Sequence, residues 1–109
     1  MKIKTTAKEI RNGYGKKVAI CYYGAQYLLR NHEPIAYTRG VYGWNFDVYM
    51  VDGVTICTGY RGMVGVTPDY ETLNKYERAA RDIWENRNLD HDKKTELVET
   101  LLLDFLHSI

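Results

Sequence analysis

A two-residue turn, Asp52-Gly53, constrains the fold of this chain more than any other feature of its sequence. Both residue types tolerate the positive φ angles of a type I′ turn, and the runs on either side are rich in strand formers. The sequence therefore predicts a β-hairpin over about residues 44–60. If Val51 pairs with Val54, the register of the whole hairpin follows. The further expected pairs are Met50–Thr55, Tyr49–Ile56, Val48–Cys57, Asp47–Thr58, Phe46–Gly59 and Asn45–Tyr60.

Alternation of side chains along this hairpin separates two faces. One face is apolar and is predicted to lie in the core: Trp44, Phe46, Val48 and Met50, with Cys57. The other face is mixed: Asn45, Asp47, Tyr49, Ile56, Thr58 and Tyr60. Two interpretations of the mixed face stay open. It forms an interaction surface, or the segment 7–12 or Tyr27–Leu29 covers it as a second small core.

Local signals predict the elements of the N-terminal half. Thr6 and Glu9 have the spacing of a capping box, which favours a short helix over about residues 7–12. Strand formers predict strands at residues 17–23 and 35–38, and helical turns are expected at 25–30.

Two amphipathic helices are predicted for the C-terminal part. Thr67-Pro68 favours a cap and first turn for a helix over about 68–86, and Asp90 caps a second helix that runs to about residue 107. The expected inward residues are Leu73, Tyr76, Ala80, Ile83 and Trp84, then Leu97, Leu101, Leu102, Phe105 and Leu106. We therefore expect one α+β domain, residues 1–109, in which an antiparallel helix pair covers a small antiparallel sheet.

Composition excludes several classes of protein. The longest apolar run, Leu101–Leu103, is far too short for a membrane span, and Met1–Lys4 leads into polar residues rather than a signal peptide. We therefore expect a protein of the cytoplasm that contacts no membrane. In that reducing compartment, Cys21 and Cys57 are predicted to be small core residues without a bridge.

The charge is unevenly distributed along the chain. Residues 1–66 carry nine Lys and Arg against four Asp and Glu, whereas residues 67–109 carry six against ten. A basic half can bind nucleic acid or a nucleotide, and an acidic helix pair can imitate nucleic acid, although helices commonly carry excess acid for structural reasons alone.

Catalytic, metal and cofactor motifs are not recognisable. The three histidines, His32, His91 and His107, are scattered, so neither a metal site nor a cofactor is predicted. Asp47 beside Tyr49 could act as a base if it were partly desolvated, but it could equally be a surface carboxylate bonded to Thr58. We therefore predict that the protein is not an enzyme.

Tyrosine is the most informative residue type for function. Eight of the ten tyrosines lie between Tyr14 and Tyr60, and Tyr and Arg dominate binding hot spots. The candidate partner-binding surface is the mixed hairpin face with its adjoining loops: Arg39, Tyr42, Asn45, Asp47, Tyr49, Tyr60 and Arg61.

Several stretches carry a resemblance to a group of proteins: Gln26–Leu29, Ala36-Tyr37, Gly43–Asn45, Asp47, Tyr49, Asp52–Val54 and Thr58–Tyr60. In these the chain resembles small accessory proteins of phages and integrative elements of Gram-positive bacteria. The resemblance implies a non-catalytic binding protein of the anti-CRISPR type. Such a protein would inhibit a defence nuclease in the host cytoplasm by occupying a protein or nucleic-acid-binding surface, with a Cas nuclease complex as partner.

Overall fold

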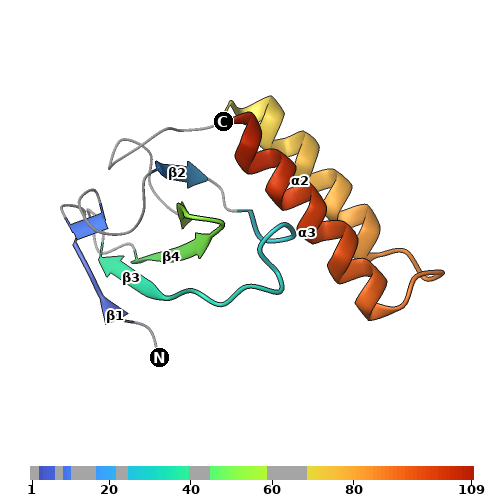
Figure 1. The fold of residues 1–109 in the computed structure, drawn as a ribbon, viewed down its shortest axis with the longest axis horizontal. Helices are drawn as coiled ribbons and strands as arrows, with labels where there is room; N and C mark the ends of the chain where they lie inside the picture. Colours follow the sequence, from blue (N-terminus) through green and yellow to red (C-terminus); the bar gives the residue numbers. More distant parts are fainter. Residues whose placement is uncertain (1–2, 7–8, 11–16, 22–24, 40–44, 59–68) are drawn as a thin grey trace. The chain divides into compact units, whose positions relative to one another are not determined.

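The computed structural model describes residues 3–6, 9–10, 17–21, 25–39, 45–58 and 69–109 (Figure 1). Its elements are β1 (Ile3–Lys4), β2 (Lys17–Cys21), β3 (Ala36–Arg39), β4 (Asn45–Val51), β5 (Val54–Thr58), α2 (Tyr70–Trp84) and α3 (His91–Ser108). The predicted α+β class is confirmed. Contacts divide the chain into two compact units. The sheet unit comprises Met1–Gly24 and His32–Pro68, and the helical unit comprises Ala25–Asn31 and Asp69–Ile109.

Among the described residues, five strands form one sheet in the order β1-β3-β4-β5-β2. The three central strands are antiparallel, but β1 runs parallel to β3 and β2 runs parallel to β5. The prediction of an antiparallel sheet is therefore wrong at both edges, and the sheet is mixed. Parallel neighbours are joined by crossovers rather than tight turns, so no local signal announces them. The strand β1 was not predicted, because two residues are too few to show a period.

The hairpin of β4 and β5 closes through Asp52 and Gly53, whose φ angles are 50° and 75°. Positive φ at both residues is the signature of a type I′ turn. The five pairs expected from Val51–Val54 to Asp47–Thr58 are those observed. The further pairs with Gly59 and Tyr60 lie outside the described residues.

The apolar hairpin face is buried where the structure describes its side chains. Val48 and Cys57 are buried and Met50 is half-buried. Cys57 is a free thiol, as predicted. Trp44 and the side chains of Phe46 and Cys21 lie outside the described part of the chain.

The N-terminal capping box has the predicted contacts. The Thr6 hydroxyl accepts a hydrogen bond from the Glu9 backbone N–H at 3.2 Å, and the Glu9 carboxylate accepts one from the Thr6 N–H at 3.4 Å. Glu9 and Ile10 are helical, and the other residues of the predicted 7–12 helix are not described.

In the helical unit, α2 and α3 lie side by side and antiparallel (Figure 1). Asp90 caps α3 as predicted, and its carboxylate accepts from the Lys93 N–H at 2.8 Å. The cap predicted for the preceding helix is wrong, because Asp69 rather than Thr67 is the N-cap of α2. Its carboxylate accepts from both the backbone N–H and the hydroxyl of Thr72, each at 3.3 Å. A carboxylate with two donors also gains from the helix dipole, which a hydroxyl does not.

The facing surfaces of the two helices are apolar. On α2 the buried residues are Leu73, Ala80 and Trp84, all within the predicted stripe. On α3 they are Val98, Leu102, Phe105 and Leu106. The stripe of α3 thus includes Val98, which was not predicted, whereas Leu97 and Leu101 are only half-buried. The packing of this pair on the sheet stays a prediction, as does the single domain over 1–109.

The segment Ala25–Asn31 belongs to the helical unit although it lies far from α2 in the sequence. It forms one helical turn, closed by a hydrogen bond from Leu29 N–H to the Ala25 carbonyl at 2.8 Å. Within the described ranges, neither α2 nor α3 is both long and apolar enough to cross a membrane.

Candidate functional site

The structure describes part of the predicted partner-binding surface. Asn45, Asp47 and Tyr49 lie at alternate positions of β4, and the backbone of Arg39 in β3 pairs with that of Asn45. Residues at alternate positions of a strand share one face. The sheet therefore brings four of the seven predicted residues together through their backbones. The other three, Tyr42, Tyr60 and Arg61, lie outside the described residues.

The mixed hairpin face is neither open nor fully covered. Ile56, directly opposite Tyr49, has 0% of its surface exposed, and Val51 is buried as well. Asp47, Tyr49 and Thr58 on the same face are half-buried. The apolar centre of this face is therefore covered while its polar and aromatic neighbours keep accessible surface, and both interpretations stay open.

Thr58 does contact Asp47, although not in the way that the sequence suggested. The Thr58 hydroxyl donates to the backbone carbonyl of Asp47 at 3.4 Å, rather than to its carboxylate. The alternative in which the Asp47 carboxylate bonds to Thr58 therefore finds no support in the described contacts of Thr58. The hypothesis that Asp47 acts as a base stays a prediction.

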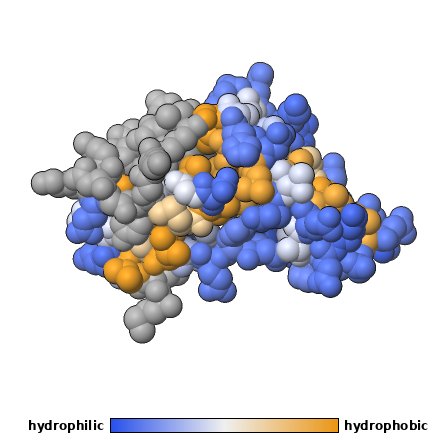
Figure 2. Space-filling model, viewed as in Figure 1, coloured by the Kyte–Doolittle hydropathy of each residue, from blue (hydrophilic) through white to orange (hydrophobic). Residues whose placement is uncertain are grey.

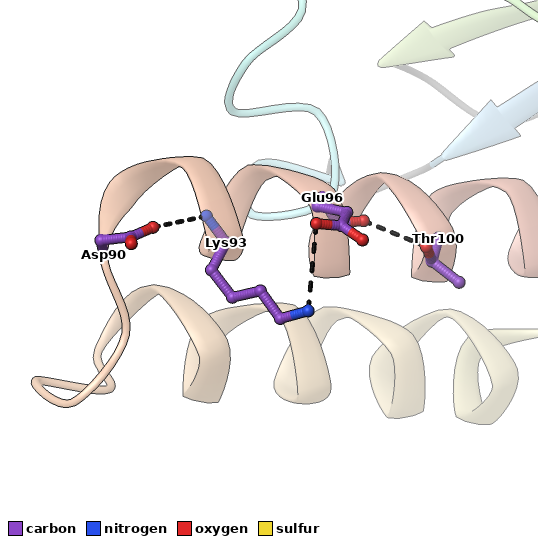
Figure 3. Close-up of polar contacts among 4 residues, drawn as sticks. All are labelled: Asp90, Lys93, Glu96 and Thr100. Atoms are coloured by element: carbon purple, nitrogen blue, oxygen red, sulfur yellow. Dashed lines mark hydrogen bonds and ion pairs between the residues drawn. The ribbon is translucent and has the colours of Figure 1, made fainter.

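A second candidate surface is the outer face of α3. Asp92, Glu96 and Glu99 follow at i, i+4 and i+7, which places them on one side of the helix. The Lys93 ammonium lies 3.9 Å from Glu96, and both side chains are largely exposed (Figure 3). The outer face of α2 instead carries both signs, with Glu71, Lys75, Arg78 and Asp82 in that order. Hydrophilic residues predominate on the visible side of the helix pair (Figure 2).

Three described titratable groups, Cys57, Glu77 and Tyr76, have raised pKa values. Burial raises the pKa of the Cys57 thiol to about 11, so this thiol stays protonated near neutral pH and is a poor nucleophile. Burial also raises the pKa of Glu77, and hydrogen bonds from the backbone N–H groups of Leu28 and Tyr27 oppose that rise. The hydrogen bond from Tyr76 to Asp104, 2.7 Å long, raises the pKa of the Tyr76 hydroxyl. Ionisation of Tyr76 would break this bond.

Metal-binding side chains do not gather in the described ranges of the chain. No three His, Cys, Asp or Glu residues there lie close enough together to hold a metal ion. His91, at the start of α3, is exposed, and its ring lies 6.0 Å from that of Trp84.

Sequence reasoning missed one cluster of side chains in the helical unit. Arg30, Trp84, His91 and Lys94 line a cavity. No sequence signal brings Arg30 to the helices, because it lies in a separate turn whose docking depends on contacts far apart in the chain. The only related prediction was that Trp84 points inward.

No protein-family model matches this sequence, and no curated protein or solved structure matches it significantly. The resemblance to accessory proteins of phages and integrative elements therefore stays a prediction.

Proposed function

We propose that this protein is a non-catalytic binding protein that inhibits a host defence nuclease in the bacterial cytoplasm. It does so by occupying a protein or nucleic-acid-binding surface of the nuclease, as anti-CRISPR proteins do. The partner is a Cas nuclease complex, and the binding surface is the mixed hairpin face. The sequence resemblance supplies the setting of this proposal.

One observation carries the choice of surface. Asp47 and Tyr49 are half-buried on β4. On the same face of the sheet, Ile56 of the neighbouring strand β5 is fully buried. A charge and an aromatic ring held on a rigid strand beside an apolar centre have the composition of a binding hot spot. Their remaining accessible surface is available for a partner to cover.

The state of the buried thiol and carboxylate supports a non-catalytic role. The Cys57 thiol has a pKa of about 11, and the Glu77 carboxylate accepts hydrogen bonds from two backbone N–H groups of the helical unit. A nucleophile needs a lowered pKa or an adjacent base, and a general base needs access to its substrate. Both groups are better explained by folding.

The test is protection of phage in a bacterial strain that carries an active CRISPR system, combined with pull-down of Cas proteins and guide complexes. The variant Asp47→Lys with Tyr49→Ser should lose protection and capture together. The matched control, Glu96→Gln with Glu99→Gln on α3, should keep both. Circular dichroism verifies that each variant is folded.

The possible outcomes separate the function from the surface. If the wild-type protein neither protects phage nor retains a Cas protein, the proposed function is wrong. If only the α3 variant loses protection, the function stands but the acidic face of α3 is the binding surface. If the protein instead binds nucleic acid without a nuclease, with an affinity that falls steeply with salt, the basic N-terminal half is responsible.

A further inference from the structure

The helical unit contains a cavity of about 200 Å³ that is independent of the hairpin face. Its lining comes from three segments: Arg30 from the Ala25–Asn31 turn, Trp84 from the end of α2, and His91 and Lys94 from the first turns of α3. Three of these four side chains are basic. The surrounding C-terminal part of the chain is acidic overall, so this cluster is opposite in charge to its surroundings in the sequence.

Trp84 holds the cavity together. Its indole N–H donates to the Tyr27 carbonyl at 2.8 Å, and only 8% of the residue is exposed. The Arg30 guanidinium carbon lies 5.2 Å from the centre of the Trp84 ring, a distance typical of a cation–π contact. The Lys94 ammonium donates to the Trp84 carbonyl at 3.0 Å. The Trp84 ring therefore positions Arg30, and the Trp84 backbone carbonyl positions Lys94.

The two cationic groups of the cavity, Arg30 and Lys94, keep donors for a ligand. Among the described residues, no carboxylate lies within ion-pair distance of Arg30, His91 or Lys94. Arg30 has five N–H donors, and Lys94 uses only one of its three on Trp84. The nearby Asp90 carboxylate is engaged as the cap of α3.

We propose that this cavity binds a phosphate group. Arg and Lys are the side chains that bind phosphate most often, one as a planar fork and the other as a point charge. Cationic donors from two segments, Arg30 from the turn and Lys94 from α3, suit an anion with several oxygens pointing in different directions better than a planar carboxylate. The volume lies below the roughly 300–1,000 Å³ of sites that enclose drug-sized ligands, so the cavity accommodates one phosphate group rather than a whole nucleotide.

The test is a titration of the full-length, isotope-labelled protein with inorganic phosphate at constant ionic strength, followed by NMR. The indole N–H of Trp84 and the backbone amides of His91 and Lys94 should shift in a saturable manner at millimolar phosphate. Chloride and acetate at the same ionic strength should leave them in place. Shifts of equal size with chloride or acetate, or no saturable shift with phosphate, would overturn the proposal.

Two adjacent lysines provide a matched pair of variants. Lys94→Met removes a cavity charge, whereas Lys93→Met removes a neighbouring charge that does not line the cavity. Affinity for phosphate should fall roughly tenfold in the first variant and stay within about twofold in the second, because one charge-assisted hydrogen bond contributes about that much. An equal loss in both variants would show that phosphate responds to general charge only.

Lys94→Met also removes the hydrogen bond to the Trp84 carbonyl and could unfold the helical unit. Arg30→Gln, at an exposed position, then decides the question, and an unchanged affinity in that folded variant would contradict the proposal. A second titration with a nucleoside 5′-monophosphate identifies the source of the phosphate. Tighter binding than inorganic phosphate assigns the site to a nucleotide, and equal binding assigns it to the phosphate group alone.

Discussion

The two units of this protein are held together in different ways. In the sheet unit, backbone hydrogen bonds between neighbouring strands specify the arrangement, and one turn sets the register of β4 and β5. In the helical unit, side chains of α2 and α3 bind the turn at Ala25–Asn31. The Glu77 carboxylate accepts from the N–H groups of Tyr27 and Leu28, at 3.1 Å and 2.9 Å. A single side chain therefore matters more in the helical unit, whereas backbone geometry matters more in the hairpin.

Truncation of the apolar centre of the helix pair should have the largest effect. Phe105 is buried, and its ring lies 5.4 Å from that of Tyr76. Phe105→Ala should lower the free energy of unfolding by about 3–5 kcal/mol, measured by urea denaturation. Leu101→Ala on the same helix is the control, because Leu101 is only half-buried. An equal loss at Leu101 would show that the buried stripe has been assigned wrongly.

Loss of the Glu77 carboxylate tests whether one side chain holds the Ala25–Asn31 turn. Glu77→Ala leaves two part-buried backbone N–H groups without their acceptor, so the free energy of unfolding should fall by about 1–3 kcal/mol. Glu85→Ala, at an exposed position one residue beyond α2, should cause no comparable loss. Hydrogen exchange at the amides of Tyr27 and Leu28 should accelerate in the first variant only.

The pH dependence of stability also tests the role of Glu77 in the helical unit. Burial raises the pKa of Glu77 above its ordinary value of 4.5. The Glu77 carboxylate therefore binds a proton more readily in the folded protein than in the unfolded chain. As the pH rises from 4.5 through the raised pKa, ionisation of Glu77 therefore destabilises the folded state. Glu77→Gln keeps an acceptor oxygen but cannot ionise. The wild-type protein should lose stability relative to this variant over that pH range, and a constant difference between the two would contradict the assignment.

The hairpin should respond to backbone geometry instead. Gly53 has a φ of 75°, and no atom beyond Gly53 and its two chain neighbours lies within 4 Å of the position that a β-carbon would take. Gly53→Ala therefore costs only backbone strain, about 1 kcal/mol in thermal or urea unfolding. Asp52→Asn should be nearly neutral, since Asn also tolerates positive φ. A larger loss in the Asn variant than in the Ala variant would mean that the Asp52 side chain determines the turn.

The smallest effect is expected for the ion pair on the outer face of α3. Lys93 and Glu96 have side chains that are 51% and 71% exposed. A double-mutant cycle with Lys93→Met and Glu96→Gln should give a coupling energy of about 0.2–0.5 kcal/mol that decreases with added salt. A coupling above 1 kcal/mol would mean that this surface pair contributes as much to stability as the part-buried contacts of Glu77.

The sequence predictions were accurate for contacts between residues close together in the chain and less accurate for contacts between distant segments. The hairpin pairs and the Asp90 cap were predicted because each depends on residues close together in the chain. The cap of α2 was misplaced, because Thr67 and Asp69 compete two residues apart and the carboxylate gains more from the helix dipole. The parallel pairing of β2 with β5 joins distant segments and leaves no local pattern.

The candidate sites show the same limit. Alternation places Asp47 and Tyr49 on one face of β4, but their partial burial depends on residues elsewhere in the fold. The cavity lined by Arg30, Trp84, His91 and Lys94 could not be predicted at all. The hydrogen bond from Trp84 to Tyr27 that brings Arg30 to it spans 57 residues of sequence.

The position of the Ala25–Asn31 turn also decides how this chain can be divided. The chain passes from one unit to the other three times, at residues 24–25, 31–32 and 68–69. The helix pair expressed from Asp69 onward would lack the backbone that satisfies Glu77 and the indole of Trp84. A cut at one loop therefore cannot release a complete helical unit. Only a fragment to which the Ala25–Asn31 segment is restored, as an added peptide or by circular permutation, retains the contacts that define it.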